Sequence, residues 1–327
     1  MTTGIRDIAA AAKVSVSTVS NVMNNRPNVG ELTRQRVLQL CKEMNYIPNV
    51  AGKSLKSGTS KTILFVFSDF GRSYYLKIIE GINDCASASG YDLLICTNKS
   101  CEKYLRNKLS DGCIILDAHI KSDTLFRSAR ESYPIVVLDR MLESPHIKNV
   151  IVNNYQSMTS LMEGIVGRGY RQFAFIGGKE YTDDTRERFQ AFKDVLAGHE
   201  IPFHQERYFS GNYREESGYR GTKIFMMGKK LPEIIVCAND DMAIGAIKAL
   251  GDGGLRVPED VAVTGFDNID NAESAGLTTV AIPNYERGYL ATHSLIENIK
   301  GRQNMETLKI PASVIWRDTV ISKVKTV

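Results

Sequence analysis

The first fifty residues carry their apolar side chains at helical rather than strand spacing. One helical stretch ends near Lys13-Val14, and a second, Val16–Met23, follows directly after Ser15. The Ser15 hydroxyl is placed to accept a backbone amide from the first turn of that helix. A third stretch spans residues 33–45, with Thr33 as its candidate N-cap. Three short helices with a tight turn between the first two predict a helix-turn-helix module.

From Lys61 onward, short apolar runs alternate with helix-length amphipathic segments. The runs predict buried strands at Ile63–Phe67, Leu93–Cys96, Cys113–Leu116, Ile135–Leu138, Phe173–Ile176, Ile234–Cys237 and Val261–Val263. Amphipathic segments such as Leu76–Ala88, Met158–Val166 and Met242–Leu250 separate most of them. Continuous apolar strands that alternate with helices indicate parallel sheets covered on both faces. We therefore expect an α/β body long enough for two such sheets.

Polar side chains recur directly after the predicted strands. They are Ser68-Asp69, Asp117, Asp139-Arg140, Asn239-Asp240 and Asp267-Asn268. In open α/β sheets, ligands bind beyond the carboxyl ends of the strands, so this recurrence indicates a site between two sheets. For any single one of these residues, capping of the following helix is an equally good explanation.

Length and composition narrow the class of protein. The 327 residues exceed the roughly 250–300 at which one core stops growing, so two or three domains are expected. No apolar run reaches the roughly 18–20 residues that a membrane span needs, and the polar amino terminus does not predict a secretory signal. The six cysteines lack the paired spacing of a metal site, which indicates a reduced, cytoplasmic compartment.

The net charge of +4 is unevenly distributed. Residues 1–61 contain nine basic and three acidic residues, a net charge of +6, whereas residues 62–327 contain 32 basic and 34 acidic residues, a net charge of −2. A small basic head on a mildly acidic body indicates that the head binds a polyanion. A solvated basic surface explains the charge alone equally well.

No motif of a known enzyme class is present. The sequence lacks G-x-x-x-x-G-K-[ST], G-x-S-x-G and H-E-x-x-H, and its five histidines are not clustered. Asp240-Asp241 could ligate a metal, but adjacent side chains at a helix start rarely converge, so capping is the better interpretation. We expect no catalytic residue, no metal and no cofactor.

Several segments carry a family resemblance. Ile5–Ala9 and Lys13–Asn24 closely resemble the amino-terminal signature of the LacI/GalR transcription regulators, and Asn45–Asn49 with Lys53–Leu55 resembles the linker into their hinge helix. In the body, the matching segments are Ala238–Ala243, Gly254–Val261, Gly265–Asn268, Leu277–Val280 and Trp316–Asp318. The matches occur in the family's order and extend over essentially the whole chain.

The resemblance implies three parts. Residues 1–47 would form the helix-turn-helix domain, residues 48–60 the hinge helix or linker, and residues 61–327 an effector-binding and dimerisation domain of the periplasmic-binding-protein type. Chain order suggests two crossovers between its two parallel-sheet lobes. The lobes are expected at about 61–152 plus 282–312 and at 153–281 plus 313–327.

The implied function is transcriptional regulation in the cytoplasm. The protein would be a repressor that binds a pseudo-palindromic operator in double-stranded DNA as a homodimer, without any membrane association. A small-molecule effector between the lobes would change their relative orientation and so the affinity for DNA. Whether the effector releases DNA or strengthens binding does not follow from the sequence.

The helix that starts after Ser15 is the predicted recognition helix. It would present Val16, Ser17 and Asn21 to the major groove, where an Asn amide pairs best with adenine and Val16 offers only an apolar contact. Phosphate contacts, which fix register without reading sequence, are expected from Ser15, Thr18, Ser20 and Arg26. Many relatives carry Arg or His in place of Asn21, so their operator sequences do not transfer.

The hinge is expected at residues 48–57. The family places there a leucine that wedges between base steps of the minor groove, and the matching residue is Leu55. Gly52 stands where alanine is common and costs about 1 kcal/mol in a helix interior. We therefore expect a marginal hinge helix that forms chiefly when two copies pack together on DNA. A flexible linker is the alternative.

Effector contacts follow from motif matches in both lobes. Lobe two would supply Arg188, Tyr213, Asn239 and Asp267, and lobe one would supply Tyr74, Tyr75 and Asp139. An arginine fork, carboxylates, an amide and aromatic faces suit the vicinal hydroxyls of a sugar.

Three alternatives to this site stay open. Stacked tyrosines would also suit a purine, although Thr182 and Asp184 stand where a purine-binding relative would have its base-reading side chains. Arg188 and Asp267 could form a purely structural ion pair. The chain could also be a ligand-binding protein without a role on DNA, which the basic head argues against.

Overall fold

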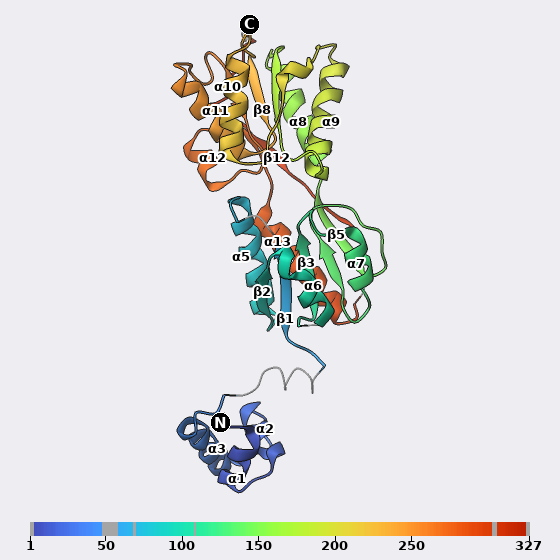
Figure 1. Ribbon diagram of the computed structural model, residues 1–327, viewed down its shortest axis with the longest axis vertical. Helices are drawn as coiled ribbons and strands as arrows, with labels where there is room; N and C mark the ends of the chain where they lie inside the picture. The colour runs from blue at the N-terminus through green and yellow to red at the C-terminus, as the bar shows by residue number, and fades with distance from the viewer. Residues whose placement is uncertain (1–2, 48–57, 68–69, 108, 303–305, 325–327) are drawn as a thin grey trace. The chain divides into compact units, whose positions relative to one another are not determined.

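The computed structural model describes residues 3–47, 58–67, 70–107, 109–302 and 306–324 (Figure 1). The chain divides into two compact units, Met1–Ser60 and Lys61–Val327. The hinge residues 48–57, with Gly52 and Leu55, lie outside the described residues. Among the described residues, no helix combines the length and the apolar character that crossing a membrane requires.

Residues 3–47 of the first unit form three helices around a small core. They are α1 (Ile5–Ala12), α2 (Val16–Met23) and α3 (Glu31–Glu43). Ile8, Val19 and Val37, one from each helix, are fully buried at the centre. The turn between α1 and α2 is tight because Lys13 adopts a left-handed conformation with φ of 51°. The predicted helix-turn-helix arrangement of short helices is therefore present.

The helix starts show one correct and one wrong prediction. Ser15 caps α2, because its Oγ accepts a hydrogen bond from the backbone N of Thr18 at 3.1 Å. Thr33 is not the N-cap of α3: the helix begins at Glu31, and Gly30, with φ −60° and ψ 146°, is its N-cap. Glu31 starts the helix two residues earlier than predicted because glycine is an acceptable N-cap residue. Gly30 supplies no side-chain bond, however.

Lobe one of the second unit contains a six-stranded parallel sheet. The strand order is β11-β5-β4-β3-β1-β2. The strands are β1 (Thr62–Phe67), β2 (Asp92–Cys96), β3 (Gly112–Leu116), β4 (Ile135–Val137), β5 (Ile147–Val152) and β11 (Leu308–Ile310). All pairs are parallel, so the carboxyl ends of the strands lie at one edge.

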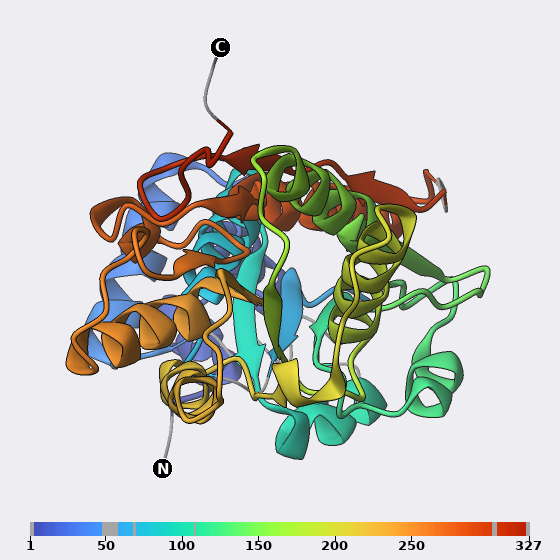
Figure 2. The same cartoon turned by 90° about the horizontal axis from the view of Figure 1, so that it is seen from above.

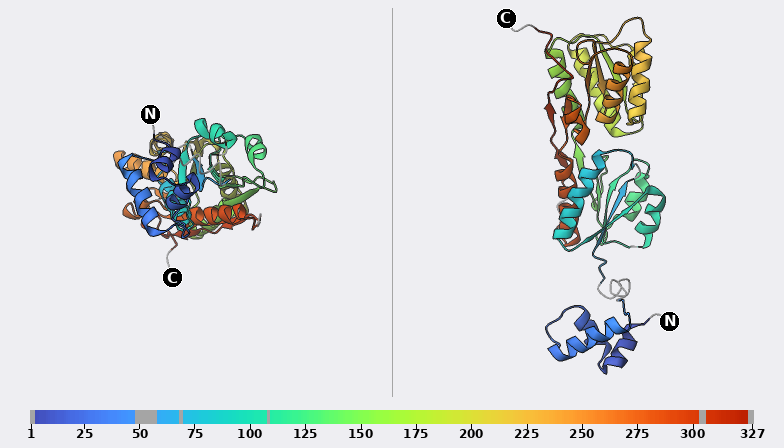
Figure 3. Two further views of the ribbon diagram at one scale, coloured as in Figure 1. Left: turned by 90° about the horizontal axis from the view of Figure 1, so that it is seen from below. Right: turned by 90° about the vertical axis from the view of Figure 1, so that its left-hand side faces the viewer.

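Helices cover both faces of this sheet. They are α5 (Tyr74–Ala88) and α13 (Asn284–Ile299) on one face, and α6 (Asn98–Asn107) and α7 (Ser122–Ser128) on the other. Ile63 and Phe65 of β1 pack on the first face, whereas Leu64 and Val66 pack on the second. The view in Figure 3, right, shows α13 beside α5 although some 200 residues separate them. They approach closely at Gly81, where a Cβ atom would lie 2.0 Å from the backbone O of Tyr285.

Lobe two contains a four-stranded parallel sheet with the order β7-β6-β8-β9. Its strands are β6 (Phe173–Gly177), β7 (Tyr208–Ser210), β8 (Ile234–Cys237) and β9 (Ala262–Thr264). Figures 1 and 2 show α8 (Asn154–Gly167) and α9 (Asp183–Gly198) on one face, with α10 (Glu215–Met226) and α11 (Asp240–Asp252) on the other. A short helix, α12 (Asp270–Ser274), follows β9.

The chain passes between the lobes three times, not twice as expected from chain order. It leaves the first sheet after β5, returns after β10 (Thr279–Ala281) and leaves again between β11 and β12 (Ser313–Ile315). Strands β10 and β12 pair with each other in antiparallel fashion. The apolar runs did not predict β5, β7, β10, β11 or β12, because each of these strands contains at least one polar residue that interrupts the run.

The uncapped start of α3 gives a test of the head. We expect Gly30→Ser to stabilise α3 by a few tenths of a kcal/mol, because the added hydroxyl can accept an orphan amide. A Cβ atom at Gly30 meets nothing within 4 Å, so it fits without strain. Gly30→Ala adds the same carbon without the oxygen and should destabilise the helix. Hydrogen exchange of the α3 amides in the intact chain measures both, and equal effects of the two variants would contradict the capping argument.

Candidate functional site

The outer face of α2 carries short polar side chains. Val19 and Val22 are buried against the other head helices, whereas Val16 is 42% exposed and Ser17 is exposed. Asn21 lies half-buried at the surface. The predicted base-contacting residues therefore share the outward face of one helix.

Hydroxyl groups cluster at the start of α2. The Oγ of Ser15 lies 2.7 Å from the Oγ of Ser17 and 2.8 Å from the Oγ1 of Thr18. Ser20 is half-buried, and its backbone O accepts from the Nδ2 of Asn24 at 2.8 Å. A phosphate oxygen only accepts hydrogen bonds, so each of these hydroxyls would contact it by turning its own proton from its present partner toward the phosphate.

The exposed Arg26 sits in a fixed loop between α2 and α3. Arg34 donates from NH1 to the Oδ1 of Asn25 at 2.8 Å and from NH2 to the backbone O of Arg26 at 2.5 Å. The backbone N of Arg26 donates to the O of Asn21 at 2.9 Å. The predicted phosphate contact therefore has a rigid base. Leu55, the remaining predicted DNA contact, lies outside the described residues.

A cavity of about 50 Å³ lies between the lobes of the second unit. It is lined by Arg72, Tyr74, Tyr75, Leu116, Asp117, Ala118, His119, Asp139, Lys179, Tyr181, Thr182, Asp184 and Tyr213. Four of the predicted effector residues, Tyr74, Tyr75, Asp139 and Tyr213, are therefore brought together from both lobes. Arg188, Asn239 and Asp267 do not line it.

Aromatic rings and one guanidinium form one wall of the cavity. The rings of Tyr74 and Tyr75 stack with their centroids 4.3 Å apart. The guanidinium carbon of Arg72 lies 4.4 Å from the ring centroid of Tyr74 and 4.2 Å from that of Tyr213 in the other lobe. Burial raises the pKa of both Tyr74 and Tyr213, so their hydroxyls stay neutral.

Two carboxylates at strand ends face the cavity from lobe one. Asp139 follows β4, and its Oδ2 lies 2.9 Å from NH1 of Arg140. Asp117 follows β3, and its Oδ1 lies 2.9 Å from Nδ1 of His119. The second oxygen of each, Asp139 Oδ1 and Asp117 Oδ2, is buried and has no hydrogen-bond partner among the described residues. Both oxygens can accept hydrogen bonds from a ligand.

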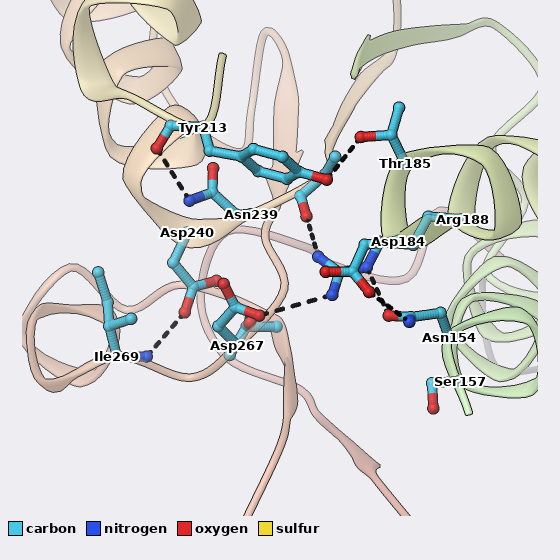
Figure 4. A network of polar contacts seen from close by, with 12 residues as sticks. Asn154, Ser157, Asp184, Thr185, Arg188, Tyr213, Asn239, Asp240, Asp267 and Ile269 are labelled. Carbon is cyan, nitrogen blue, oxygen red and sulfur yellow. Dashed lines mark hydrogen bonds and ion pairs between the residues drawn. The ribbon is translucent and has the colours of Figure 1, made fainter. Parts of the chain in front are cut away.

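Beneath the cavity, Arg188 is the centre of a buried polar network in lobe two (Figure 4). Its Nε donates to the Oδ1 of Asn154 at 2.8 Å, and its NH1 donates to the backbone O of Ala238 at 2.5 Å. Its NH2 lies 3.8 Å from the Oδ1 of Asp267. Nδ2 of Asn154 donates to the Oδ1 of Asp184 at 2.9 Å, which connects this network to the cavity wall.

Asp267 has an unusual backbone conformation and an incompletely hydrogen-bonded carboxylate. Its φ of 114° is rare for a side chain other than glycine, and its Oδ2 is a further buried oxygen without a partner among the described residues. Burial raises its pKa, against the opposite effects of Arg188 and Arg72. A strained, poorly satisfied carboxylate of this kind is typical of binding sites rather than of structural ion pairs.

Both polar atoms of the Asn239 side chain form hydrogen bonds within lobe two. Its Oδ1 accepts from the backbone N of Met242 at 3.1 Å, which caps α11, and its Nδ2 donates to the backbone O of Tyr213 at 3.2 Å. For Asn239, the alternative given for polar residues after strands, capping of the following helix, is therefore correct. Asp240 accepts from the backbone N of Ile269 and from the hydroxyl of Thr279. Among the residues that the structure describes, no three His, Cys, Asp or Glu side chains gather as metal ligands.

Comparison with known proteins finds the same two-part organisation. The family model of bacterial regulatory proteins, lacI family, matches residues 4–49, and that of the periplasmic binding protein-like domain matches residues 163–320. The probable HTH-type transcriptional repressor ExuR of Bacillus subtilis (strain 168) is 31% identical over 304 residues, which cover 90% of this chain and 91% of that protein. The chain belongs to the LacI family.

Two further similarities extend over nearly the whole chain. The HTH-type transcriptional repressor PurR of Vibrio cholerae serotype O1 (strain M66-2) is 30% identical over 328 residues, with 97% of each chain covered. A crystal structure of the Lac repressor dimer bound to operator and the anti-inducer ONPF has a TM-score of 0.85 at 24% identity, covering 98% of this chain and 99% of that one. The predicted fold class and family resemblance are confirmed, and this LacI-family chain is a DNA-binding transcriptional regulator.

Sequence reasoning missed part of this LacI-family site. Asp117 was flagged by its place after a strand, and Thr182 and Asp184 by their place in a loop, but none was predicted as a contact. Arg72, His119 and Tyr181 carried no signal at all, because they lie in loops and no apolar period or motif marks them.

The raised pKa of Asp139 gives a pH test. Burial raises it to about 7, although Arg140 opposes the shift. The native state then holds a proton that the unfolded chain releases near pH 4, so stability falls as the pH rises from 4 to 7. We expect Asp139→Asn to lose less thermal stability than the wild type between pH 5 and 8.

The matched control for this test is Asp260→Asn. Asp260 is exposed, and hydrogen bonds from the backbone and side chain of Arg256 lower its pKa, so it stays ionised throughout that range. Thermal melts across the pH series should give the control the wild-type slope. An Asp139→Asn slope equal to that of the wild type would contradict the assignment.

Proposed function

We propose that this LacI-family chain is a cytoplasmic repressor without catalytic activity, which binds a pseudo-palindromic operator as a homodimer under the control of a carbohydrate effector. Both curated relatives carry the name of transcriptional repressor. The solved neighbour is a dimer bound to operator and a small molecule. The sites proposed here are the outward face of α2 for DNA and the interlobe cavity for the effector.

The head supports DNA binding by charge and by geometry. Its net charge of +6 over residues 1–61 favours a polyanion. Short polar side chains on the outer face of α2 let the helix approach base edges closely, and only Asn21 has the two-point pattern that matches adenine. Ser15, Thr18, Ser20 and Arg26 would then fix the helix on the phosphates. A head of this kind reads few bases directly.

Asn21→Ala tests the recognition helix. We expect it to remove about 1–3 kcal/mol of preference for one base pair, because the amide is the only two-point reader on that face. Selection from randomised duplexes, followed by binding titrations, measures the preference. Gln35→Ala on α3, where Gln35 bonds Glu31 at 3.1 Å, is the matched control and should leave it unchanged. Unaltered base preference in Asn21→Ala would contradict the proposed reading.

The observation that carries the carbohydrate assignment is the pair of unpartnered carboxylate oxygens in the cavity. Asp117 and Asp139 each use one oxygen inside the protein, and the other is buried without a partner among the residues that the structure describes. Such acceptors need donors, and adjacent sugar hydroxyls supply two at fixed spacing. Tyr74 and Tyr75 both line the cavity, and aromatic side chains suit the apolar face of a sugar ring.

A purine is the second candidate effector. Aromatic side chains also suit a nucleobase, and both Thr182 and Asp184 line the cavity. A purine offers fewer hydrogen-bond donors than a sugar, however, and would leave more of the buried carboxylate oxygens unpaired. For either class, the effector controls DNA affinity only through a difference in its affinity for two lobe arrangements.

The effector site can be tested by measuring thermal shifts with a panel of sugars and purines, in the wild type and in Arg188→Gln. A ligand at 100 times its Kd stabilises the native state by about 2.7 kcal/mol, and we expect that shift to disappear in the variant. Gln cannot hold Asn154, Ala238 and Asp267 together, so the cavity wall at Asp184 would lose its support.

Two variants make that result interpretable. Lys193→Gln lies five residues later on α9, where Lys193 is exposed and its Nζ lies 5.0 Å from the ring centroid of Phe189, and it should respond like the wild type. Arg188→Lys keeps the buried charge if the Gln variant folds poorly. A full response to the same ligand in both Arg188 variants would overturn the proposed effector site.

A further inference from the structure

A hydrogen bond joins the two lobes at the rim of the cavity. The Oη of Tyr181 lies 3.0 Å from the Nε2 of His119, with the ring centroids 5.6 Å apart and the planes inclined by 60°. His119 follows β3 of lobe one, and Tyr181 follows β6 of lobe two. The side chain of His119 is 47% exposed and Tyr181 is 51% exposed, so the bond lies where the cleft meets solvent.

The lobe-one half of this contact is rigid. The Oδ1 of the buried Asp117 accepts from the backbone N of His119 at 3.0 Å and lies 2.9 Å from its Nδ1. Arg140 donates to the backbone O of Asp117 at 3.3 Å and to that of Ile120 at 2.7 Å. Asp117 therefore orients the imidazole with the Nδ1 proton inward, which leaves Nε2 to accept the proton of Tyr181.

The lobe-two half is equally fixed. Tyr181 directly precedes Thr182, the N-cap of α9, whose Oγ1 accepts from the backbone N of Thr185 at 3.4 Å. The same hydroxyl donates to the backbone O of Lys179 at 2.8 Å, which closes the turn that carries Tyr181. NH1 of Arg186 donates to the O of Tyr181 at 3.3 Å. The backbone segments that carry His119 and Tyr181 are therefore each fixed to their own lobe and separate when the lobes move apart.

The size of the cavity makes separation necessary. Its volume of about 50 Å³ holds a few water molecules, whereas sites for small organic ligands are roughly 300 Å³ or more. His119 and Tyr181 both line the cavity. A ligand of that size therefore needs the lobes to move apart, and that movement breaks the bond between these two residues.

We propose that Asp117, His119 and Tyr181 form an interlobe clasp that holds the body closed and must open for an effector to enter or leave. His119 and Tyr181 form the hydrogen bond between the lobes, and Asp117 is a positioning residue that orients His119. The inference rests on the proposed function for the role of the cavity, but the clasp itself is a property of the chain without ligand. One hydrogen bond of this kind shifts an opening equilibrium about two- to tenfold.

Tyr181→Phe tests the clasp in the full-length chain without added ligand. The amide of Ile120 bonds to the O of Asp117 at 3.2 Å, and the amide of Thr182 bonds to the O of Lys179 at 3.0 Å. We expect hydrogen exchange at both amides to become two- to tenfold faster, because loss of one hydroxyl opens both lobes. A merely local role of Tyr181 would change exchange in lobe two alone, and that result would overturn the proposal.

Tyr155→Phe is the matched control. Its hydroxyl donates to the Oδ2 of Asp194 at 2.9 Å within lobe two, and Tyr155 is 41% exposed. It should leave exchange at Ile120 unchanged.

A double variant closes the test. His119→Ala combined with Tyr181→Phe should exchange no faster than the faster single variant, since each removes the same bond. Additive effects would contradict the clasp. A chain that shows the coupled behaviour yet responds to no sugar or purine would instead contradict the proposed effector and leave the clasp standing.

Discussion

The buried guanidinium of Arg188 is the constraint on which the cleft depends. A charge removed from water costs several kcal/mol unless hydrogen bonds replace its hydration. Here the replacements come from Asn154 at the start of α8, Ala238 after β8 and Asp267 after β9. Satisfying one side chain therefore fixes the ends of three elements relative to α9. The network supports the cavity through the bond from Asn154 to Asp184, which lines the cavity wall.

Lobe one lines the cavity with acceptors that are only half satisfied. Asp117 and Asp139 are each oriented by a neighbouring cationic or imidazole group, yet each has one buried oxygen that no described residue pairs with. Unpaired buried acceptors cost free energy in the chain without ligand. A ligand that donates to both recovers that cost, and it does so only when the two lobes are correctly placed. Ligand binding and lobe arrangement are thereby linked through the same two oxygens.

How far sequence could anticipate this site depends on whether its residues carry a local signal. Family motifs predict Arg188 and Tyr213, and the position after a strand predicts Asp139. Each of these signals depends only on neighbouring positions in one segment of the chain. His119 and Tyr181 are different: they meet across 62 residues and two lobes, so their contact depends on lobe closure and not on any periodicity. The strands that were missed lack a local signal for another reason: each of β5, β7, β10, β11 and β12 contains at least one polar residue, so none of them is a continuous apolar run.

The charge balance of the cavity also limits what it can bind. Burial already raises the pKa of Asp139 to about 7, although Arg140 opposes the shift. An anionic ligand beside that carboxyl would raise the pKa further and would bind together with a proton. A hydroxyl that donates to Asp139 favours the ionised form instead and would release a proton on binding near neutral pH. Since only the second arrangement pairs the buried oxygen without adding charge, a neutral hydroxyl donor is the group that Asp139 itself accommodates at lowest cost.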